Sequence, residues 1–330
     1  MANSIYWYDY ETFGIDPRYD RLAQFAGLRT DENLNVIGDP LVMYCKPAND
    51  MLPDPMACMI TGITPQKALA EGLIEAEFIA AIHHEFSRPN TCVAGYNNIR
   101  FDDEFTRHTL YRNFYNAYSH EWQHGNSRWD IIDMVRLTRA LRPEGIEWPF
   151  DDNGNPSNRL ELLTKVNNIS HEAAHDAMSD VYATIAIARL IRDKQPRLYD
   201  YVYTHRKKDA VARLFNMRTH DAVLHASAKY SMARNSIAMV MPICQHPINK
   251  NGVIVYDLSI DPEQFILSDA DEIAGSIFTP ANELPEGVSR IPLKTVHLNK
   301  GPVVVPLKTL DEDSAKRLDI DVNQNLEHRD

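Results

Sequence analysis

Two acidic residues lie at the end of the first strand-like run of the chain. The run from Ile5 to Glu11 is rich in aromatic and β-branched residues, as strands are, and it carries Asp9 and Glu11 two positions apart. Side chains at such positions leave a strand on the same face, so the two carboxylates are expected side by side. Like charges this close raise the pKa of one carboxylate unless a cation neutralises them. The pair predicts a site for Mg²⁺ or Mn²⁺; the alternative is an acid pair on an edge strand without a metal.

The hydrophobic periodicity that follows predicts an α/β domain. Two further strand-like runs, 24–29 and 35–44, are separated by a polar turn, which favours an antiparallel meander. Apolar residues then recur at helical spacing, interrupted by a short apolar strand at 91–95. The expected helices are 78–86, 102–112, 131–141, 160–166 and 177–191. The expected fold class is α/β, a mixed sheet flanked by packed helices.

The character of the chain changes after Gln195-Pro196. One more helix is expected at about 197–215, and after it the runs are short and β-like. These runs are 237–242, 253–258, 291–298 and 302–305, followed by an acidic tail from Asp311 that is expected to be helical. Two domains are therefore expected, residues 1–195 and residues 196–330, with the boundary near 195–220. The second domain is expected to consist of a helix followed by a small β-rich barrel.

The charge of the chain is unevenly distributed. The formal net charge is −12, which by itself argues against nucleic-acid binding, because phosphate contacts need Lys and Arg. Residues 192–213 nevertheless contain seven basic residues and three acidic ones. No apolar run approaches the roughly 20 residues that span a bilayer. The N-terminus lacks the basic and apolar regions of a signal peptide, so a cytoplasmic protein without membrane contact is expected.

Three further residues are candidates for the same site as Asp9. Asp102 follows a polar turn after the 91–95 strand, where it is either a site acid or an ordinary first-turn acid of a helix. His175 and Asp180 are five positions apart, which on one continuous helix separates them by about 140°. If Asp176 caps the helix, His175 lies in the preceding loop and can share a site with Asp180. A histidine near a helix start is otherwise a cap or a surface residue.

In combination, these residues resemble the motifs of the His-type DEDD exonuclease superfamily. Asp9-Tyr10-Glu11 resembles D-x-E, the segment from Asn98 to Asp102 resembles N-x-x-[FY]-D, and the segment from His175 to Asp180 resembles H-x(4)-D. Longer segments resemble the bacterial exonuclease I family more closely; they are residues 9–14, 60–66, 95–98, 100–104 and 175–178. The resemblance continues through 195–198 and 203–206 into the β-rich segment, where it becomes looser.

This resemblance implies a fold and an activity. The implied fold is an RNase H-like (DnaQ-like) exonuclease domain followed by an SH3-like domain. The implied activity is 3′→5′ degradation of single-stranded DNA to nucleoside 5′-monophosphates, with a role in DNA repair and recombination. Members of the family carry a further helical domain, which is expected to be absent here because the sequence ends at Asp330.

The resemblance also implies roles for the site residues. The implied catalytic set is Asp9, Glu11, Asp102, His175 and Asp180. Its four acids would hold two Mg²⁺ ions, for which Mn²⁺ can substitute, with Asp9 shared between the two ions. His175 would take a proton from the attacking water, a role that suits an imidazole of ordinary pKa.

The expected substrate contacts come partly from the resemblance and partly from position. Thr61-Gly62-Ile63 resembles the family segment that meets the terminal nucleotide, and a plain turn is the alternative. The ring of Phe13 either stacks on a base or belongs to the core. The full expected set is Thr12, Phe13, Thr61, Gly62, Ile63, Asn98, Arg142, Tyr201 and His205, the last three as groove-lining residues or as a solvated helix face. A monomer is expected, with the C-terminal tail of single-stranded DNA-binding protein as a further partner.

Three other functions stay open. A 3′→5′ exoribonuclease would use the same metal chemistry, because nothing in the motifs registers a 2′-hydroxyl. A non-catalytic nucleic-acid-binding or protein-binding module would keep the fold without the activity, and the five intact acid and base positions disfavour it. A proofreading subunit of a polymerase is disfavoured by the long β-rich segment.

Overall fold

The computed structural model describes residues 3–171, 176–279, 283–284 and 290–330. The chain forms two compact units. The first contains residues 1–135 and 143–206, and the second contains residues 136–142 and 207–330. Within the described ranges, no helix is both long enough and apolar enough to cross a bilayer.

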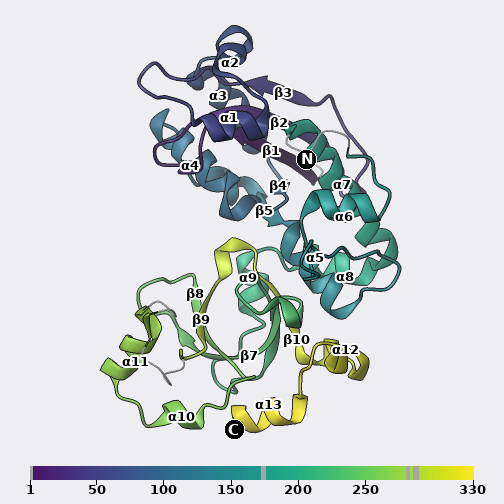
Figure 1. Ribbon diagram of the computed structural model, residues 1–330, viewed down its shortest axis with the longest axis vertical. Coiled ribbons are helices and arrows are strands. Elements are labelled where there is room, and N and C mark those ends of the chain that lie inside the picture. The colour runs from purple at the N-terminus through teal and green to yellow at the C-terminus, as the bar shows by residue number, and fades with distance from the viewer. Residues whose placement is uncertain (1–2, 172–175, 280–282, 285–289) are drawn as a thin grey trace. The chain divides into compact units, whose positions relative to one another are not determined.

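A five-stranded mixed sheet forms the centre of the first unit (Figure 1). Its strands are β1 (Ser4–Thr12), β2 (Leu22–Thr30), β3 (Leu41–Tyr44), β4 (Thr91–Gly95) and β5 (Ser127–Asp130), in the order β3-β2-β1-β4-β5. The pairs β1–β2 and β2–β3 are antiparallel, and the pairs β1–β4 and β4–β5 are parallel. The expected meander and mixed sheet are confirmed, and β1 is the central strand.

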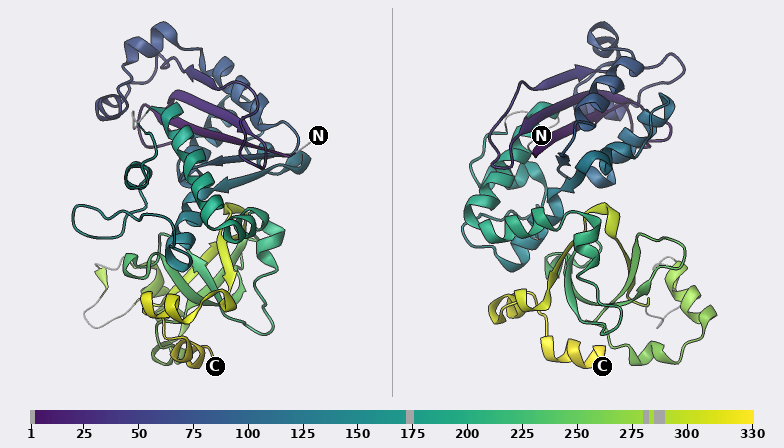
Figure 2. Two further views of the ribbon diagram at one scale, coloured as in Figure 1. Left: turned by 90° about the vertical axis from the view of Figure 1, so that its right-hand side faces the viewer. Right: turned by 180° about the vertical axis from the view of Figure 1, so that it is seen from behind.

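Helices cover both faces of this sheet (Figures 1 and 2). The helices of this unit are α1 (Pro55–Thr61), α2 (Pro65–Glu71), α3 (Glu75–Phe86), α4 (Asp102–Arg112), α6 (Leu160–Val166), α7 (Ala177–Lys194) and α8 (Pro196–Thr204). Helix α5 (Ile131–Leu141) begins in the first unit, and its residues from Arg136 onward count with the second. Helix α7 packs against β1 and β2, and the left view of Figure 2 shows it in teal crossing the purple strands. Buried residues of α3 and α4 pack with β1 on the other face.

The side chains of β1 divide between two environments. One face belongs to an aromatic core cluster that includes Tyr6, Tyr8, Tyr10, Phe25, Phe78 and Phe86. Residues at the odd positions leave the opposite face, which α7 covers. Trp7 is fully buried there, with its ring centroid 6.0 Å from that of Trp129. Asp9 and Glu11 share this second face, so the alternation of the strand places both acids under α7.

Helix α7 begins at the residue that the sequence predicts as its cap. The side chain of Asp176 accepts a hydrogen bond from the backbone N–H of Ser179 at 3.1 Å. An acid at this position also complements the positive end of the helix dipole. The helix buries an apolar stripe consisting of Val181, Ile185, Ala188 and Ile191. The cap and the stripe together fix the first turn, which carries Asp180.

The second unit is built on a five-stranded antiparallel sheet. Its strands are β6 (Val223–Ala226), β7 (Ile237–Gln245), β8 (Gly252–Asp257), β9 (Leu293–His297) and β10 (Val303–Pro306), in the order β10-β6-β7-β8-β9. Its helices are α9 (Lys208–Ala212), α10 (Glu263–Ile266), α11 (Ala270–Phe278), α12 (Glu312–Arg317) and α13 (Val322–Arg329). Mostly aliphatic side chains of the sheet form its core. The expected β-rich domain and helical tail are confirmed.

Several elements differ from the expected ones. The expected strand 35–44 is shortened to β3, because Gly38 adopts a φ of +89° and Pro40 has no amide donor. Helices α1 and α2 and strands β5 and β6 were not expected, since their apolar runs are short. The expected helix 197–215 is interrupted between α8 and α9.

The division between the units lies within the range 195–220 given in the sequence analysis. Helix α8 counts with the first unit, so the division falls after Arg206. Aromatic packing explains this: the ring of Trp129 on β5 lies edge-on to those of Tyr199 and Tyr203, at centroid distances of 5.5 and 5.2 Å. A proline that ends one helix therefore does not end the domain.

Candidate metal and catalytic site

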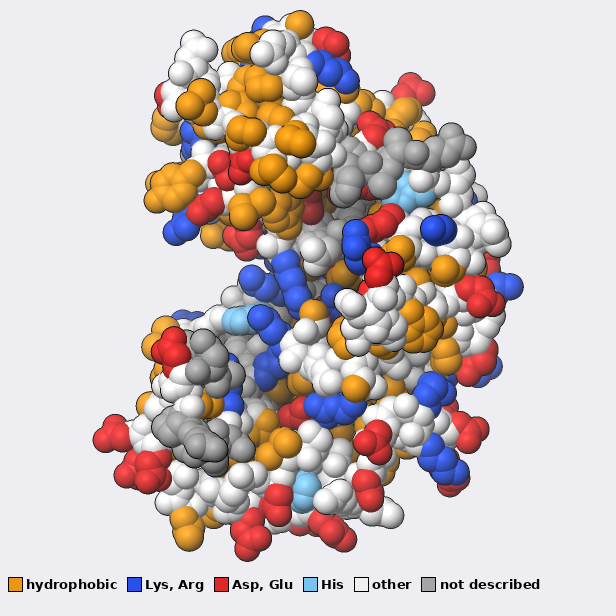
Figure 3. All heavy atoms as spheres, viewed as in Figure 1, with side chains coloured by type: hydrophobic (Ala, Val, Ile, Leu, Met, Phe, Trp, Pro, Cys, Tyr) orange, Lys and Arg blue, Asp and Glu red, His pale blue; other side chains and the backbone are white. Residues whose placement is uncertain are grey.

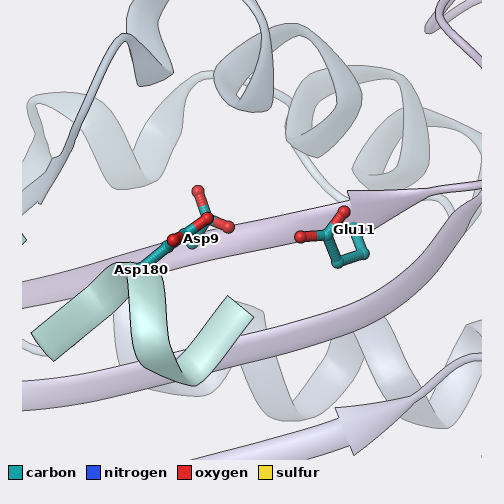
Figure 4. Close-up of side chains that lie close together, drawn as sticks. All are labelled: Asp9, Glu11 and Asp180. Carbon is teal, nitrogen blue, oxygen red and sulfur yellow. The ribbon is translucent and has the colours of Figure 1, made fainter. Parts of the chain in front are cut away.

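Three carboxylates from two elements converge on the α7 face of the sheet. Asp9 and Glu11 come from β1, and Asp180 comes from the first turn of α7. One oxygen of each lies within 4.8 Å of the others, and Figure 4 shows Asp180 approaching the strand acids from the helix. Glu11 is 7% exposed, and the other two are half-buried. The structure thus brings together three acids that are up to 171 positions apart in the sequence (180 − 9).

Asp102 is the fourth predicted acid. It is the first residue of α4, directly after the short turn helix η1 (Asn98–Arg100) and Phe101, and it is 5% exposed. It is not one of the three carboxylates within 4.8 Å, yet it is the first of the neighbouring charges that raise the pKa of Asp9. Asp102 is therefore both a first-turn acid and a neighbour of the carboxylate cluster, and the two alternatives of the sequence analysis do not exclude one another.

Burial and mutual repulsion hold these carboxyls toward the protonated form in the metal-free protein. Burial is the largest cause of the raised pKa of Asp9, followed by the charges of Asp102, Asp180 and Glu11. Burial, followed by the charges of Asp180 and Asp102, raises the pKa of Glu11 to about 8. Burial and the charge of Asp103 raise the pKa of Asp102. These neighbouring charges all have the same sign, so full ionisation of the cluster is costly without a counter-charge.

The chemistry of the donors fits a divalent cation. The cluster offers carboxylate oxygens, which are the hard ligands that Mg²⁺, Mn²⁺ and Ca²⁺ prefer. A cation among them would reverse the repulsion that raises their pKa values. Asp9, Glu11 and Asp180 are therefore the residues of this site that can hold a metal, with Asp102 beside them.

A histidine outside the expected motif contacts the cluster. Nε2 of His171 lies 2.5 Å from Oδ1 of Asp180, and Nδ1 lies 3.1 Å from the hydroxyl of Thr164. The sequence gives no signal for this contact, because nine positions (180 − 171) is not a helical repeat and a motif histidine is already present at 175. His175 itself lies outside the described residues, so its role as a base stays a prediction.

The acid next to Asp102 anchors the start of α4. Asp103 is paired with Arg128 of β5, with side-chain exposures of 3% and 5%, and it accepts a hydrogen bond from the hydroxyl of Tyr8 at 2.5 Å. Arg128 also lies 3.2 Å from Glu121. This buried network ties the first turn of α4 to β1 and β5, which fixes the position of Asp102. The sequence gives no sign of this network, because two acids at a helix start are usually solvated.

A second buried acid holds the turn that leads into Asp102. Asp130, at the end of β5, accepts hydrogen bonds from the backbone N–H groups of Asn97 at 2.8 Å and Ile99 at 3.3 Å. Between them lies Asn98, a predicted substrate contact, which is 1% exposed. Among the described residues its side-chain amide has no hydrogen-bond partner. The amide of Asn98 therefore has donors and an acceptor that no described residue uses, and it lies in the turn that leads into Asp102.

Two predicted nucleotide contacts are core residues. Phe13 is fully buried and Ile63 is 3% exposed, in a cluster with Ala23 and Ala68. Stacking by the Phe13 ring and insertion of Ile63 beneath a base both require an exposed apolar surface, which neither side chain has in this structure. Of the two alternatives for Phe13, the structure agrees with the second, a residue of the core. Thr12 is 7% exposed, and its hydroxyl donates to the carbonyl of Gly14 at 2.6 Å.

The segment 61–63 forms the end of α1. Gly62 has a φ of +68°, a left-handed conformation that favours glycine at a helix C-terminus. Among the described residues, apart from its two chain neighbours, no heavy atom lies within 4 Å of the position that a Cβ would take. Its conformation, and not a close approach within the protein, explains the glycine. The hydroxyl of Thr61 accepts a hydrogen bond from the N–H of Ile63 at 3.2 Å. Figure 3 shows hydrophobic side chains gathered on this part of the first unit, and the exposed apolar residues of α1 are Met56, Met59 and Ile60.

The three predicted groove residues belong to different units. Tyr201 and His205 lie in the first unit, on and directly after α8, and their rings stack at a centroid distance of 4.0 Å. Arg142 lies in the second unit and donates to the carboxylate of Asp311 and to the carbonyl of Thr309, each at 3.0 Å. The structure thus brings Tyr201 and His205 together, and it gives Arg142 partners within its own unit.

Known proteins resemble the whole chain. The family model described as Exonuclease matches residues 6–188, and the model described as Exonuclease I SH3-like domain matches residues 206–330. Exodeoxyribonuclease I of Haemophilus influenzae is 52% identical over 319 residues, which are 96% of this chain and 67% of that protein.

Solved structures agree with these matches. A moderately thermophilic exonuclease I from Methylocaldum szegediense has a TM-score of 0.97 at 58% identity and covers 99% of this chain, which spans 70% of that one. The crystal structure of E. coli exonuclease I in complex with a dA16 oligonucleotide has a TM-score of 0.97 at 49% identity, with the same coverage. The chain therefore belongs to the exodeoxyribonuclease I family, and it is an exonuclease whose α/β domain is followed by an SH3-like domain.

Proposed function

We propose that this protein removes nucleotides from the 3′ end of single-stranded DNA and releases nucleoside 5′-monophosphates, with two Mg²⁺ ions as cofactors. The convergence of Asp9, Glu11 and Asp180 within 4.8 Å carries the proposal. Two facts add support: the chain belongs to the exodeoxyribonuclease I family, and the E. coli relative has been solved in complex with oligonucleotides.

The cofactor part of the proposal rests on the donor set. Exonucleases of this family need divalent metal ions. Asp9, Glu11 and Asp180 would hold them together with Asp102, and carboxylates are the ligands that suit Mg²⁺ best. When bound, such ions polarise a phosphodiester and lower the pKa of water.

Other residues of the chain would transfer a proton, position Asp102 and bind the terminal nucleotide. The imidazole of His175 would take a proton from the attacking water, which needs a neutral ring near pH 7 to 8. The buried pairing of Asp103 with Arg128 would keep Asp102 in place. The buried amide of Asn98, which has no hydrogen-bond partner among the described residues, can bind a polar group of the terminal nucleotide.

Single-stranded DNA would be bound mainly by stacking and by backbone contacts. The stacked rings of Tyr201 and His205 suit a splayed base, and this kind of contact tolerates any sequence. Thr12, Thr61, Gly62 and Arg142 remain proposed contacts. We further propose a monomer that acts in DNA repair and recombination and that binds the C-terminal tail of single-stranded DNA-binding protein.

A digestion experiment tests the proposal. The full chain is incubated with 5′-labelled single-stranded DNA and Mg²⁺, and a ladder that shortens from the 3′ end is expected, with 5′-monophosphates as products. Parallel reactions contain EDTA, the corresponding duplex, and RNA of the same sequence. Equal cleavage of RNA would favour the exoribonuclease alternative, and cleavage that persists in EDTA would overturn the metal assignment.

A further inference from the structure

His171 is a buried histidine with both ring nitrogens engaged. Its side chain is 5% exposed, whereas that of Asp180 is 20% exposed. Nε2 lies 2.5 Å from Oδ1 of Asp180, and Nδ1 lies 3.1 Å from the hydroxyl of Thr164. In the tautomer that carries its proton on Nε2, the ring donates to the carboxylate and accepts from the hydroxyl.

Thr164 gives this histidine a rigid support. It is fully buried on α6, and its hydroxyl lies 3.0 Å from the carbonyl of Leu160 and 3.1 Å from that of Glu161. Helix α6 packs against α7, which carries Asp180. These contacts link α6, through His171, to a carboxylate of α7. The hydroxyl of Thr164 has one proton, so it donates either to Nδ1 of His171 or to a backbone carbonyl of its own helix.

Asp180 needs such a partner more than the strand acids do. It stands in the first turn of α7 and faces Asp9 and Glu11, whose charges repel it. Rotation of its side chain toward solvent would relieve that repulsion. A donor on Oδ1 opposes the rotation and keeps the carboxylate directed toward the strand acids. Outer partners of this kind orient metal-binding carboxylates, and their loss typically weakens metal binding about 10- to 100-fold.

We propose that His171 is a positioning residue that holds the Asp180 carboxylate toward Asp9 and Glu11 and thereby sets the affinity of the site for a divalent cation. This inference rests on the proposed function only in treating these three acids as a metal site. It assigns His171 no contact with DNA or with the reacting atoms.

The test measures metal binding without DNA and turnover separately. Mn²⁺ binding to the full chain is measured by isothermal titration calorimetry for wild type, His171→Ala, His171→Gln and Thr164→Val. His83→Ala is the matched control, because His83 also bonds a hydroxyl, that of Ser87 at 3.2 Å, but lies on α3. Circular dichroism establishes that each variant is folded.

The expected results form a series. His171→Ala raises the Kd for Mn²⁺ about tenfold or more. Thr164→Val raises it less. A double variant that combines His171→Ala with Thr164→Val, measured in the same way, binds Mn²⁺ no more weakly than His171→Ala, since both changes act through one contact. His171→Gln stays close to wild type, because its amide places a donor at a similar reach. In a digestion assay, excess Mn²⁺ restores the kcat of His171→Ala toward the wild-type value.

Two results would overturn the proposal. One is a folded His171→Ala protein with the wild-type Kd for Mn²⁺. The other is a kcat of His171→Ala that stays low at saturating Mn²⁺, which would give His171 a part in the reaction itself. If His171→Ala does not fold, the comparison of Thr164→Val with wild type decides in the same way. A Kd series as expected in a protein without nuclease activity would support this inference and reject the proposed function.

Discussion

The two faces of β1 show how one strand serves stability and chemistry at once. The even face carries three tyrosines within an aromatic core whose ring contacts are favourable. The odd face carries Asp9 and Glu11, whose charges oppose one another and that of Asp180. The first face contributes free energy of folding, and the second costs some of it until a cation binds. Substitutions on the two faces should therefore change different observables.

The largest expected effect is on the odd face and on activity. Asp9→Asn is expected to lower kcat/KM at least about 10⁴-fold, because the loss of one residue from a catalytic set costs nearly as much activity as the loss of the whole set. The metal-free protein is expected to melt at the same or a higher temperature, since one repelling charge is gone. Digestion kinetics and thermal melts in EDTA measure both quantities. Asp39→Asn, at an exposed position, is the control; a clear loss of stability in Asp9→Asn would break the comparison.

The next effect is on the even face and on stability. Phe25 on β2 is fully buried, with ring centroids 5.4 to 6.5 Å from those of five other aromatic residues. Phe25→Ala is expected to lower the free energy of unfolding by about 3–5 kcal/mol, measured by urea denaturation. Phe114→Ala, at a position that is 99% exposed, should change it little. Equal effects of the two changes would contradict the assignment of the core.

A smaller effect is expected where the two faces are connected. Tyr8 is on the aromatic face, but its hydroxyl donates to Asp103, which anchors the start of α4. Tyr8→Phe leaves a buried carboxylate with one partner fewer and should cost about 1–3 kcal/mol of stability. It should also lower kcat, because Asp102 loses part of its support. Tyr19→Phe, at a position that is 71% exposed, is the control for denaturation, and an unchanged kcat in Tyr8→Phe would show that the two faces are independent.

The smallest effect is a pH dependence of the metal-free protein. The pKa of Glu11 is raised from 4.5 to about 8, mainly by burial. Between these values the folded protein holds a proton that the unfolded chain has released, so stability should fall as the pH rises from about 4.5 to 8. Glu11→Gln should flatten this slope in EDTA, and Mg²⁺ should flatten it in wild type. Melts at a series of pH values measure it, and a wild-type slope equal to that of Glu11→Gln would exclude the assigned pKa.

The sequence predicted the parts of the site that depend on regular geometry. The i, i+2 rule placed Asp9 and Glu11 on one face, and the Asp176 cap placed Asp180 in the first turn of α7, as observed. The family, the α/β fold and the SH3-like second domain followed from motifs in order along the chain, and all three are confirmed.

What the sequence could not predict depends on contacts between distant elements. The contact of His171 with Asp180 depends on the path of a loop between two helices, and no repeat encodes it. The pairing of Asp103 with Arg128 needs the parallel addition of β5 to β4, a strand too short to expect. The role of Phe13 was ambiguous, because a phenylalanine next to a site can either be buried in the core or contact the substrate, and the sequence does not distinguish the two.

The packing of α8 on Trp129 has a consequence for how such proteins can exchange parts. A recombination event that joined two family members at Pro196 would separate Trp129 from the Tyr199 and Tyr203 rings that pack on it. A crossover just after Arg206 would keep that set of rings in one parent. Laboratory shuffling between family members should therefore recover functional junctions after this arginine more often than at Pro196.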